Sequence, residues 1–299
     1  MIIGFPAECM TCVLGKRVRS LPADWSDERC SAYLREAMRI IVEADPSEGM
    51  PLVVLRIEAL DRDWGLPQPD YGPIKRHWNQ RLMALAPRLR ADIASAADPL
   101  ARAMQYARAA NYIDFGAVED VNEAQLMALL EAAVADLPDA AEYARFRREL
   151  DSARSLVYLT DNSGEIVADR LLLEQLRALR PDLRLTAIVR GQDVLNDATL
   201  EDARMVGLDE VAEVVGNGSG LAGSFLDQMD ARSLALIGEA DVIVAKGQAN
   251  FETLQGCGLN IYYLFLSKCG RFERRFGFKK MQGVLVNERR LKPGSEGRA

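Results

Sequence analysis

Two hydrophobic patterns follow one another along the chain, and the change lies near residue 150. Before it, apolar residues recur at steps of three and four, as in "SDERCSAYLREAMRIIVEA" (26–44) and "KRHWNQRLMALAPRLRADIA" (75–94). This spacing places apolar side chains on one face of a helix, and the dominant residues, Ala, Leu, Arg and Glu, are good helix formers. The pattern predicts an all-helical N-terminal cap region over residues 1–150.

From residue 151 onward, short apolar runs alternate with helical segments. Six runs are predicted strands: "SLVYLT" (155–160), "LRLTAIVR" (183–190), "VAEVVG" (211–216), "DVIVAK" (241–246), "NIYYLFLSK" (260–268) and "GVLVNE" (283–288). Strands that alternate with helices favour a mostly parallel sheet with helices on both faces. We therefore predict the α/β class, with a core over residues 151–290, an edge strand as its last element, and a polar tail over residues 291–299.

Composition narrows the class of protein. The chain has 299 residues, a net charge of −7 and a pI of about 5.1. An acidic chain is a poor candidate for non-specific nucleic-acid binding, and we expect the basic stretch "RFERRFGFKK" (271–280) to be a solvated loop. No apolar run approaches the ~20 residues of a membrane helix, and "MIIGFPAECMTC" (1–12) is unlike a secretory signal. We expect a soluble cytoplasmic protein that binds neither nucleic acid nor a membrane.

Histidine and cysteine usage limits the chemistry. The chain has five irregularly spaced cysteines, which argues against a disulfide framework, and a single histidine, His77. Mechanisms that need several histidines are excluded, and His77 itself is expected to be a packed or surface residue. A metal site must then use oxygen or sulfur ligands. Cys9 and Cys12 form a lone CxxC, which is half of a zinc site, and packing on a helical face is the favoured interpretation.

Polar residues follow the predicted strands, at the edge where open α/β sheets bind their ligands. They are Asp161, Asn162, Asn196, Asp197, the glycine-rich loop 217–224, Lys246, Asn250 and Lys268. Two carboxylates and an amide oxygen suit a hard cation such as Mg²⁺ or Mn²⁺. Two lysines and a glycine-rich loop supply the cations and N–H groups that a phosphate needs. The sequence therefore predicts a metal and phosphate site at this edge.

Each of these residues also has a plainer interpretation. Asp161 and Asp197 are both typical of helix N-caps, Lys246 and Lys268 could be solvated lysines, and the glycine-rich loop could be a turn. The haloacid-dehalogenase type of phosphatase is disfavoured, because Ser163 stands where that type needs a second carboxylate. A P-loop is absent as well.

Several segments together resemble the damage-control phosphatase family, which was long labelled a domain of unknown function. One member of that family has also been described as an acidic-residue methyltransferase. The resemblance covers nearly the whole chain and rests on "ECMTC", "DYGPIK", "NYIDFG", "DNSGEIVAD", "RGQDVLNDATLEDA", "GNGSGLAG", "AKGQANFETL" and "FLSKC". It implies a helical N-terminal region on a Rossmann-like α/β core. It also implies hydrolysis of small phosphorylated metabolites, such as sugar phosphates or damaged cofactor precursors, with Mn²⁺, Mg²⁺, Co²⁺ or Ni²⁺.

The resemblance also implies roles for individual residues. Its metal ligands fall on Asp161, Asn162 and Asp197, and its phosphate-contacting lysine falls on Lys268, with Lys246 beside it. The further candidates for contact with substrate are Asn250, Gly218, Ser219, Gly220, Asn111 and Asp114. Two departures from the family pattern leave the substrate open: Gln248 stands where some members have Asp, and "PDYGP" (69–73) differs in order from the more usual Asp-Pro-Tyr.

Some alternatives stay open at this point. Glu165 is a candidate catalytic residue that could orient a ligand or a water, and it is also typical of an acidic residue at a helix N-terminus. Asp161 could be a ligand or a nucleophile. An S-adenosylmethionine-dependent carboxyl methyltransferase and a non-catalytic metabolite-binding module are alternatives to a phosphatase. The physiological substrate, the metal and the oligomeric state are not determined by the sequence.

Overall fold

The structure is a computed structural model that describes residues 7–45, 48–118 and 120–291. The chain forms two compact units, Met1–Asp70 and Tyr71–Ala299. The cap boundary predicted near residue 150 does not coincide with this division, because the helices between residues 71 and 152 pack on the α/β core. The predicted polar tail, from residue 292 onward, lies outside the described residues.

The first unit is helical throughout its described part. It contains α1 (Ala7–Ser20), α2 (Asp27–Glu43) and α3 (Met50–Asp63). Its small core includes Ile41, Val53 and Ile57, and Cys9 packs against this core while Cys12 is exposed. This position agrees with the packing interpretation of Cys9.

The second unit contains the sheet and most of the helices. Its strands are β1 (Ser155–Leu159), β2 (Arg184–Val189), β3 (Glu213–Gly216), β4 (Val242–Lys246), β5 (Ile261–Leu266) and β6 (Gly283–Asn287). Its α-helices are α4 (Tyr71–Ser95), α5 (Pro99–Ala110), α6 (Glu123–Ala133), α7 (Ala140–Ser152), α8 (Glu165–Leu179), α9 (Leu200–Met205), α10 (Ala231–Glu239), α11 (Gly247–Leu254) and α12 (Gly270–Phe276). Short 3₁₀ turns are η1 (Leu208–Glu210), η2 (Leu226–Gln228) and η3 (Glu288–Arg290).

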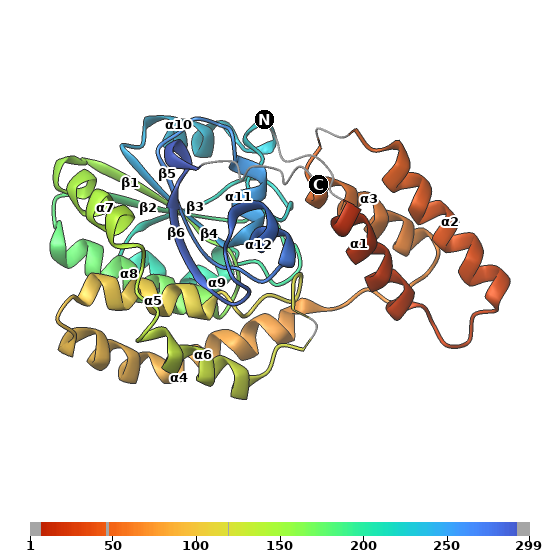
Figure 1. The fold of residues 1–299 in the computed structure, drawn as a ribbon, viewed down its shortest axis with the longest axis horizontal. Helices are drawn as coiled ribbons and strands as arrows, with labels where there is room; N and C mark the ends of the chain where they lie inside the picture. The colour runs from red at the N-terminus through yellow and green to blue at the C-terminus, as the bar shows by residue number, and fades with distance from the viewer. Residues whose placement is uncertain (1–6, 46–47, 119, 292–299) are drawn as a thin grey trace. The chain divides into compact units, whose positions relative to one another are not determined.

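The six predicted strands form one sheet in the order β3-β2-β1-β4-β5-β6. The first five strands are parallel, and β6 pairs antiparallel with β5 at one edge. Figure 1 shows α5 and α8 along one side of the sheet, α4 and α6 outside them, and α10 on the other side. The predicted α/β class, with a mostly parallel sheet and helices preceding it, is confirmed.

Burial on both faces explains the composition of the strands. Every residue of β1, β4 and β5 is buried, as expected where helices cover both faces of a parallel sheet. Several helices begin at a side-chain cap, so the chain enters each of them with a satisfied first turn. The capping residues are Asp98, Asn122, Asp139 and Asp230.

The direction in which successive strands are added reverses at β1. From β1 the chain adds β2 and β3 on one side and then returns to add β4 on the other. Ligands in open α/β sheets bind at this switch point, outside the carboxyl ends of the strands. The topology therefore predicts a ligand site among the residues that follow β1 and β4.

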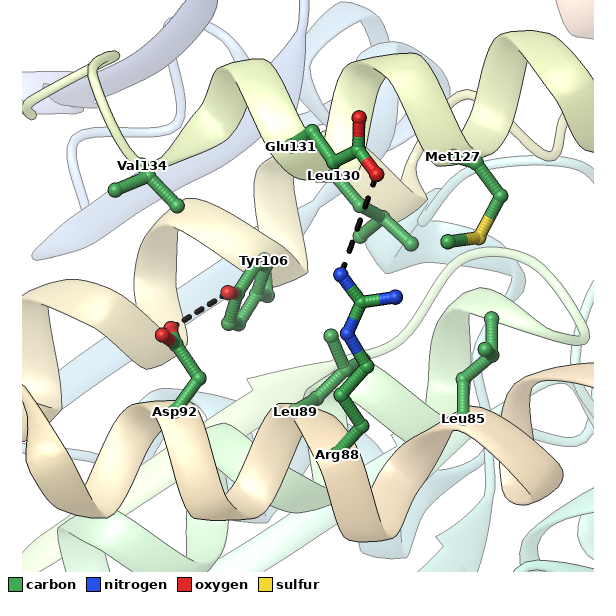
Figure 2. Close-up of a pocket in the computed structure, with 9 residues that line it drawn as sticks. All are labelled: Leu85, Arg88, Leu89, Asp92, Tyr106, Met127, Leu130, Glu131 and Val134. Carbon is green, nitrogen blue, oxygen red and sulfur yellow. Dashed lines mark hydrogen bonds and ion pairs between the residues drawn. The ribbon is translucent and has the colours of Figure 1, made fainter.

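A cavity of about 260 Å³ lies elsewhere, among the helices of the outer layer (Figure 2). Its wall consists of Leu85, Arg88, Leu89, Asp92, Tyr106, Met127, Leu130, Glu131 and Val134. The Tyr106 hydroxyl donates to Asp92 (2.6 Å), and Arg88 and Glu131 form a loose ion pair at 4.0 Å. None of the residues singled out at the strand ends contributes to this wall. Within the described ranges, no helix is both long and apolar enough to cross a bilayer.

Candidate active site

Two neighbouring strand ends bring the predicted metal ligands together. Asp161 and Asn162 follow β1, and Asp197 lies in the loop after β2. Asn162 and Asp197 pair in an isolated antiparallel bridge, and the Asp161 carbonyl accepts a hydrogen bond from Ala198 N at 2.8 Å. Backbone pairing therefore places the side chains from the two strand ends in one crevice.

The Asp161 carboxylate is buried and has well-defined partners. Its Oδ2 accepts hydrogen bonds from Asn162 Nδ2 (2.7 Å) and Asn111 Nδ2 (3.1 Å), and the residue is 4% exposed. Burial raises the pKa of Asp161 well above its usual value, and the negative charges of Glu165 and Asp197 raise it further. Asp161 is therefore a carboxyl group held away from water and close to two other carboxyl groups.

The helix-cap interpretation of the two aspartates is wrong. Helix α8 begins after Gly164, and α9 begins after Thr199, whose hydroxyl and backbone N–H both bond to Asp202. Neither Asp161 nor Asp197 caps a helix. Their burial at the sheet edge is therefore not explained by the helices that follow them.

Arg190 is a residue of this site that the sequence analysis missed. Its Nε donates to Asp197 Oδ2 at 2.7 Å, and its Nη2 lies 3.7 Å from Asp161 Oδ1. The same guanidinium donates to the Gly223 carbonyl and approaches Asn250 Oδ1 at 3.4 Å. Its only signal in the sequence is a charged residue at the end of a predicted strand, and its contacts arise from tertiary structure.

Lys246 does not have the phosphate-binding position that the sequence analysis gave it. The side chain is fully buried, and Nζ donates to Glu165 Oε1 (2.7 Å), Asp169 Oδ1 (2.9 Å) and the Ala107 carbonyl (2.7 Å). An ammonium group carries three protons, so this one has none left for a ligand. Glu165 is likewise fully buried, which makes it a positioning residue for the groups in front of it.

Lys268 is the lysine whose charge acts on the candidate ligand Asp161. Its Nζ donates to Asp114 Oδ2 and to the Asn111 carbonyl, both at 2.6 Å. Among the described residues, the third proton of this ammonium has no acceptor. Its charge lies near enough to Asp161 to oppose the rise in the pKa of that carboxyl.

Asn111 and Asp114 lie in the turn that ends α5, beside the candidate ligands. Asn111 uses its whole carboxamide within the protein: Nδ2 donates to Asp161 and to Glu165 Oε2 (2.8 Å), and Oδ1 accepts from Leu266 N (3.1 Å). Asp114 remains 16% exposed at its side chain, beside Lys268. Asn111 therefore orients the carboxylates, and Asp114 lies closer to solvent.

Asn250 was predicted to contact substrate, but its side chain bonds to other parts of the protein. Asn250 is fully buried and donates to the carbonyls of Thr160 (3.0 Å) and Lys246 (2.6 Å), while its Oδ1 accepts from Ser224 Oγ at 2.7 Å. Asn250 therefore links the ends of β1 and β4, and both polar atoms of its carboxamide already have partners within the protein. Asn196 is also structural, since it bonds the Ile113 carbonyl (3.0 Å) and Phe115 N (3.2 Å).

The loop after β3 folds on itself rather than opening a helix. Asn217 Oδ1 accepts hydrogen bonds from Ser219 N (2.9 Å) and Gly191 N (2.8 Å), and Leu221 N bonds to Ser219 Oγ (3.2 Å). Gly218 lies against Gly191, where a Cβ on Gly191 would be 2.4 Å from the Gly218 backbone. The next α-helix begins only at residue 231, so Gly218, Ser219 and Gly220 do not form the predicted phosphate cradle at a helix start.

Comparisons with known proteins decide the family. Residues 5–282 match the family described as the Damage-control phosphatase ARMT1-like domain. The chain belongs to this family. A damage-control phosphatase of Archaeoglobus fulgidus is 31% identical over 275 residues, a match that covers 90% of this chain and 94% of that protein. A damage-control phosphatase of Pyrococcus horikoshii is 33% identical over 141 residues, which cover 46% of this chain and 47% of that one.

A solved structure shares the fold of this damage-control phosphatase family member. The crystal structure of a DUF89 family protein from Pyrococcus horikoshii superimposes with a TM-score of 0.76 at 22% identity, over 95% of this chain and 99% of that chain. Membership of the family supports a phosphatase reaction and small phosphorylated metabolites as substrates.

The crevice of this family member fits a hydrated divalent cation. Asp161, Asn162 and Asp197 offer the hard oxygen atoms that Mg²⁺ and Mn²⁺ prefer. Among the described residues, no cluster of three or more His, Cys, Asp or Glu side chains has the geometry of a metal site, so a full protein cage is not formed. One or two carboxylates with retained waters is the usual arrangement for Mg²⁺. Burial and, after it, the neighbouring carboxyl groups raise the pKa of Asp161, and a bound cation would oppose the rise.

Proposed function

We propose that this protein is a divalent-metal-dependent phosphatase that hydrolyses small phosphorylated metabolites in the crevice at the carboxyl ends of β1 and β2. The observation that carries the proposal is the convergence of Asp161, Asn162 and Asp197 at the switch point of the sheet, with the charge of Lys268 acting on Asp161. The resemblance to the family favours Mn²⁺, Mg²⁺, Co²⁺ or Ni²⁺ as the ion. It also favours sugar phosphates or damaged cofactor precursors as substrates.

The proposed division of labour follows from burial and charge. When bound, a divalent cation supplies a Lewis acid that polarises a phosphoryl oxygen and makes a bound water more acidic. Asp161, Asn162 and Asp197 would hold that cation. The remaining proton of Lys268 would bind a phosphoryl oxygen and offset the charge that develops on the transferring group. Because these side chains are almost fully buried, their electrostatic interactions are stronger than they would be in water.

The methyltransferase alternative finds little support in the same geometry. It expects an acidic residue after the second strand to bind the cofactor ribose. Asp193 and Asp197 both lie after β2, so that requirement is met, but the glycine-rich loop follows β3 and not the first strand, where a Rossmann-type cofactor site would need it. The names of the relatives favour the phosphatase.

The test is hydrolysis of p-nitrophenyl phosphate by metal-stripped protein, with Mg²⁺, Mn²⁺, Co²⁺ or Ni²⁺ added back. Asp161→Asn should abolish the metal-restored turnover without unfolding the chain. Asp241→Asn is a matched control, because Asp241 precedes β4 at the opposite end of the strands and bonds Arg154 N at 2.8 Å. Equal turnover in Asp161→Asn and in the unaltered chain would contradict the proposal. Metal binding without turnover of any phosphate ester tested would support the binding-module alternative.

A further inference from the structure

Behind the candidate site lies a buried triad of charged residues, Glu165, Lys246 and Asp169. All three side chains are fully buried, so no substrate contacts them. Glu165 and Asp169 are four residues apart on α8, which places both carboxylates on the same face of that helix. Lys246 reaches them from the end of β4.

The lysine joins the two carboxylates rigidly. Lys246 Nζ lies 2.7 Å from Glu165 Oε1 and 2.9 Å from Asp169 Oδ1, and its third proton goes to the Ala107 carbonyl. Burial lowers the pKa of Lys246, and the two carboxylates outweigh burial, so that its pKa is raised overall. The ammonium is therefore a fixed, charged link between α8 and β4.

The other oxygen of Glu165 orients the carboxamide of a candidate ligand. Glu165 Oε2 accepts hydrogen bonds from Asn162 Nδ2 (2.9 Å) and Asn111 Nδ2 (2.8 Å). Asn162 Nδ2 also donates to Asp161 Oδ2 at 2.7 Å. Because the nitrogen of the Asn162 carboxamide is held on this side, its oxygen is left for the crevice. A reversed carboxamide would present N–H groups to a cation instead.

Asp169 satisfies two buried donors, but only one of its two oxygens takes part. Its Oδ1 accepts from the Tyr158 hydroxyl (2.7 Å) and from Lys246, while Oδ2 has no hydrogen-bond partner among the described residues. A buried polar atom without a partner is unfavourable, and replacing a whole buried ion pair by apolar residues of similar volume is often neutral or stabilising. The buried triad as a whole therefore calls for an explanation beyond stability.

We propose that Asp169 is a positioning residue of the metal site, which acts through Lys246 and Glu165 to hold the Asn162 oxygen toward the cation. The inference rests on the proposed function, because it assigns Asn162 to the ion. Without Asp169, one proton of Lys246 loses its acceptor, and the ammonium can shift from the position in which it holds Glu165 Oε1. The Asn162 carboxamide can then reverse.

The experiment measures Mn²⁺ binding to metal-free protein by isothermal titration calorimetry, alongside kinetics. Residues that orient metal ligands without touching the metal typically contribute about 10–100-fold to metal affinity. We therefore expect Asp169→Leu to weaken Mn²⁺ binding by about tenfold or more, and to lower kcat more than it changes KM. Tyr158→Phe is the matched control, because it removes a hydrogen bond from the same carboxylate but leaves the link to Lys246.

A double-mutant cycle separates positioning from a simple loss of negative charge. If Asp169 acts through Glu165, then Asp169→Leu weakens Mn²⁺ binding in the unaltered chain but has little further effect in a Glu165→Gln background. Equal losses in both backgrounds would mean that Asp169 contributes only its charge, and the inference would be overturned. If the leucine variant does not fold, the same cycle with Asp169→Ala, which removes both oxygens without adding bulk, decides the matter.

The failure of the inference and the failure of the proposed function give different results. Unchanged Mn²⁺ affinity in the Asp169 variants, with binding lost in Asp161→Asn, would overturn the positioning role alone. An unaltered chain that binds no Mn²⁺ would overturn the proposed metal site, and the positioning role with it.

Discussion

The carboxylate of Asp161 lies directly against the Cα of Gly247. A Cβ on residue 247 would be 1.9 Å from Asp161 Oδ2, closer than non-bonded atoms approach. Gly247 also has a φ of +79°, a conformation that L side chains rarely adopt. The start of α11 therefore requires glycine for two separate reasons, and one of them is the space that the candidate metal ligand occupies.

We predict that Gly247→Ala abolishes metal-restored phosphatase activity. The added methyl group must displace the Asp161 carboxylate, and the positive φ costs a further ~1–3 kcal/mol. Gly258→Ala is the matched control, because Gly258 has a φ of +76° and, among the described residues, no atom lies within 4 Å of the place a Cβ would occupy. Mn²⁺ titration and thermal unfolding of both variants measure the difference. Normal activity in Gly247→Ala would show that Asp161 is not needed where it lies.

The sheet and the residues at its edge could be predicted from the sequence for a simple physical reason. Strands buried on both faces are short apolar runs, and the residue after each run must lie at the carboxyl edge of a parallel sheet. Asp161, Asn162 and Lys268 closely follow such a run, so they are expected at one edge whichever strands are neighbours. Asp197 lies farther along the loop after β2, and its bridge with Asn162 places it there.

The sequence does not show that Lys246 and Lys268 have different roles, because both lysines follow a predicted strand. Only the structure shows that one is covered by α5 and α8 while the charge of the other acts on Asp161. The Ala107 carbonyl that binds Lys246 comes from a residue 139 positions earlier in the chain. Arg190 was missed for the same reason, since its contacts with Gly223 and Asn250 join segments that are distant in sequence.

Loss of the charge should mainly reduce stability at Lys246 and mainly reduce catalysis at Lys268. Lys246→Met leaves Glu165 and Asp169 buried without a cation, and breaking a buried pair in this way costs about 3–5 kcal/mol. Lys268→Met should lower kcat strongly with a smaller loss of stability, because its partner Asp114 remains partly exposed. Denaturant unfolding and steady-state kinetics on both variants, with Lys268→Arg as a charge-retaining control, test this. A stable but inactive Lys246→Met would contradict the assignment of Lys246 to the scaffold.

The stability of metal-free protein should carry a pH signature from Asp169. Burial raises the pKa of Asp169 to about 7, although the Lys246 ammonium opposes the rise. A carboxyl whose pKa is higher in the folded state binds its proton more tightly there. Its contribution to stability is therefore fully present below about pH 4, the ordinary pKa range of an aspartate, and is lost as the pH rises through 7. The loss is at most about 4 kcal/mol, at about 1.4 kcal/mol for each pKa unit.

Comparison with Asp169→Asn isolates this contribution from that of other carboxyl groups. The difference in the free energy of unfolding between the unaltered chain and Asp169→Asn should change in favour of the variant as the pH rises from 4 to 7. Denaturant unfolding at several pH values in the presence of a chelator measures it. A difference that stays constant over this range would show that Asp169 does not titrate there.

Arg190 should contribute through the shape of its guanidinium as well as through its charge. One edge of the group bonds Asp197 at 2.7 Å, and the other reaches the Gly223 carbonyl and Asn250. Arg190→Gln should destabilise the fold by about 3–5 kcal/mol, because Asp197 is left buried without a cation. Since Asp197 is also a candidate ligand, removing the group that fixes it should weaken Mn²⁺ binding as well.

Arg190→Lys distinguishes the two contributions. A lysine keeps the charge beside Asp197, but its ammonium cannot make the forked contacts of a planar guanidinium. We therefore expect stability and Mn²⁺ affinity between those of the unaltered chain and Arg190→Gln. If Arg190→Lys matches the unaltered chain in both measurements, charge alone explains the residue, and its contacts with Gly223 and Asn250 are dispensable. If it matches Arg190→Gln, the guanidinium fork is what joins the ends of β1 and β2 to the loop after β3.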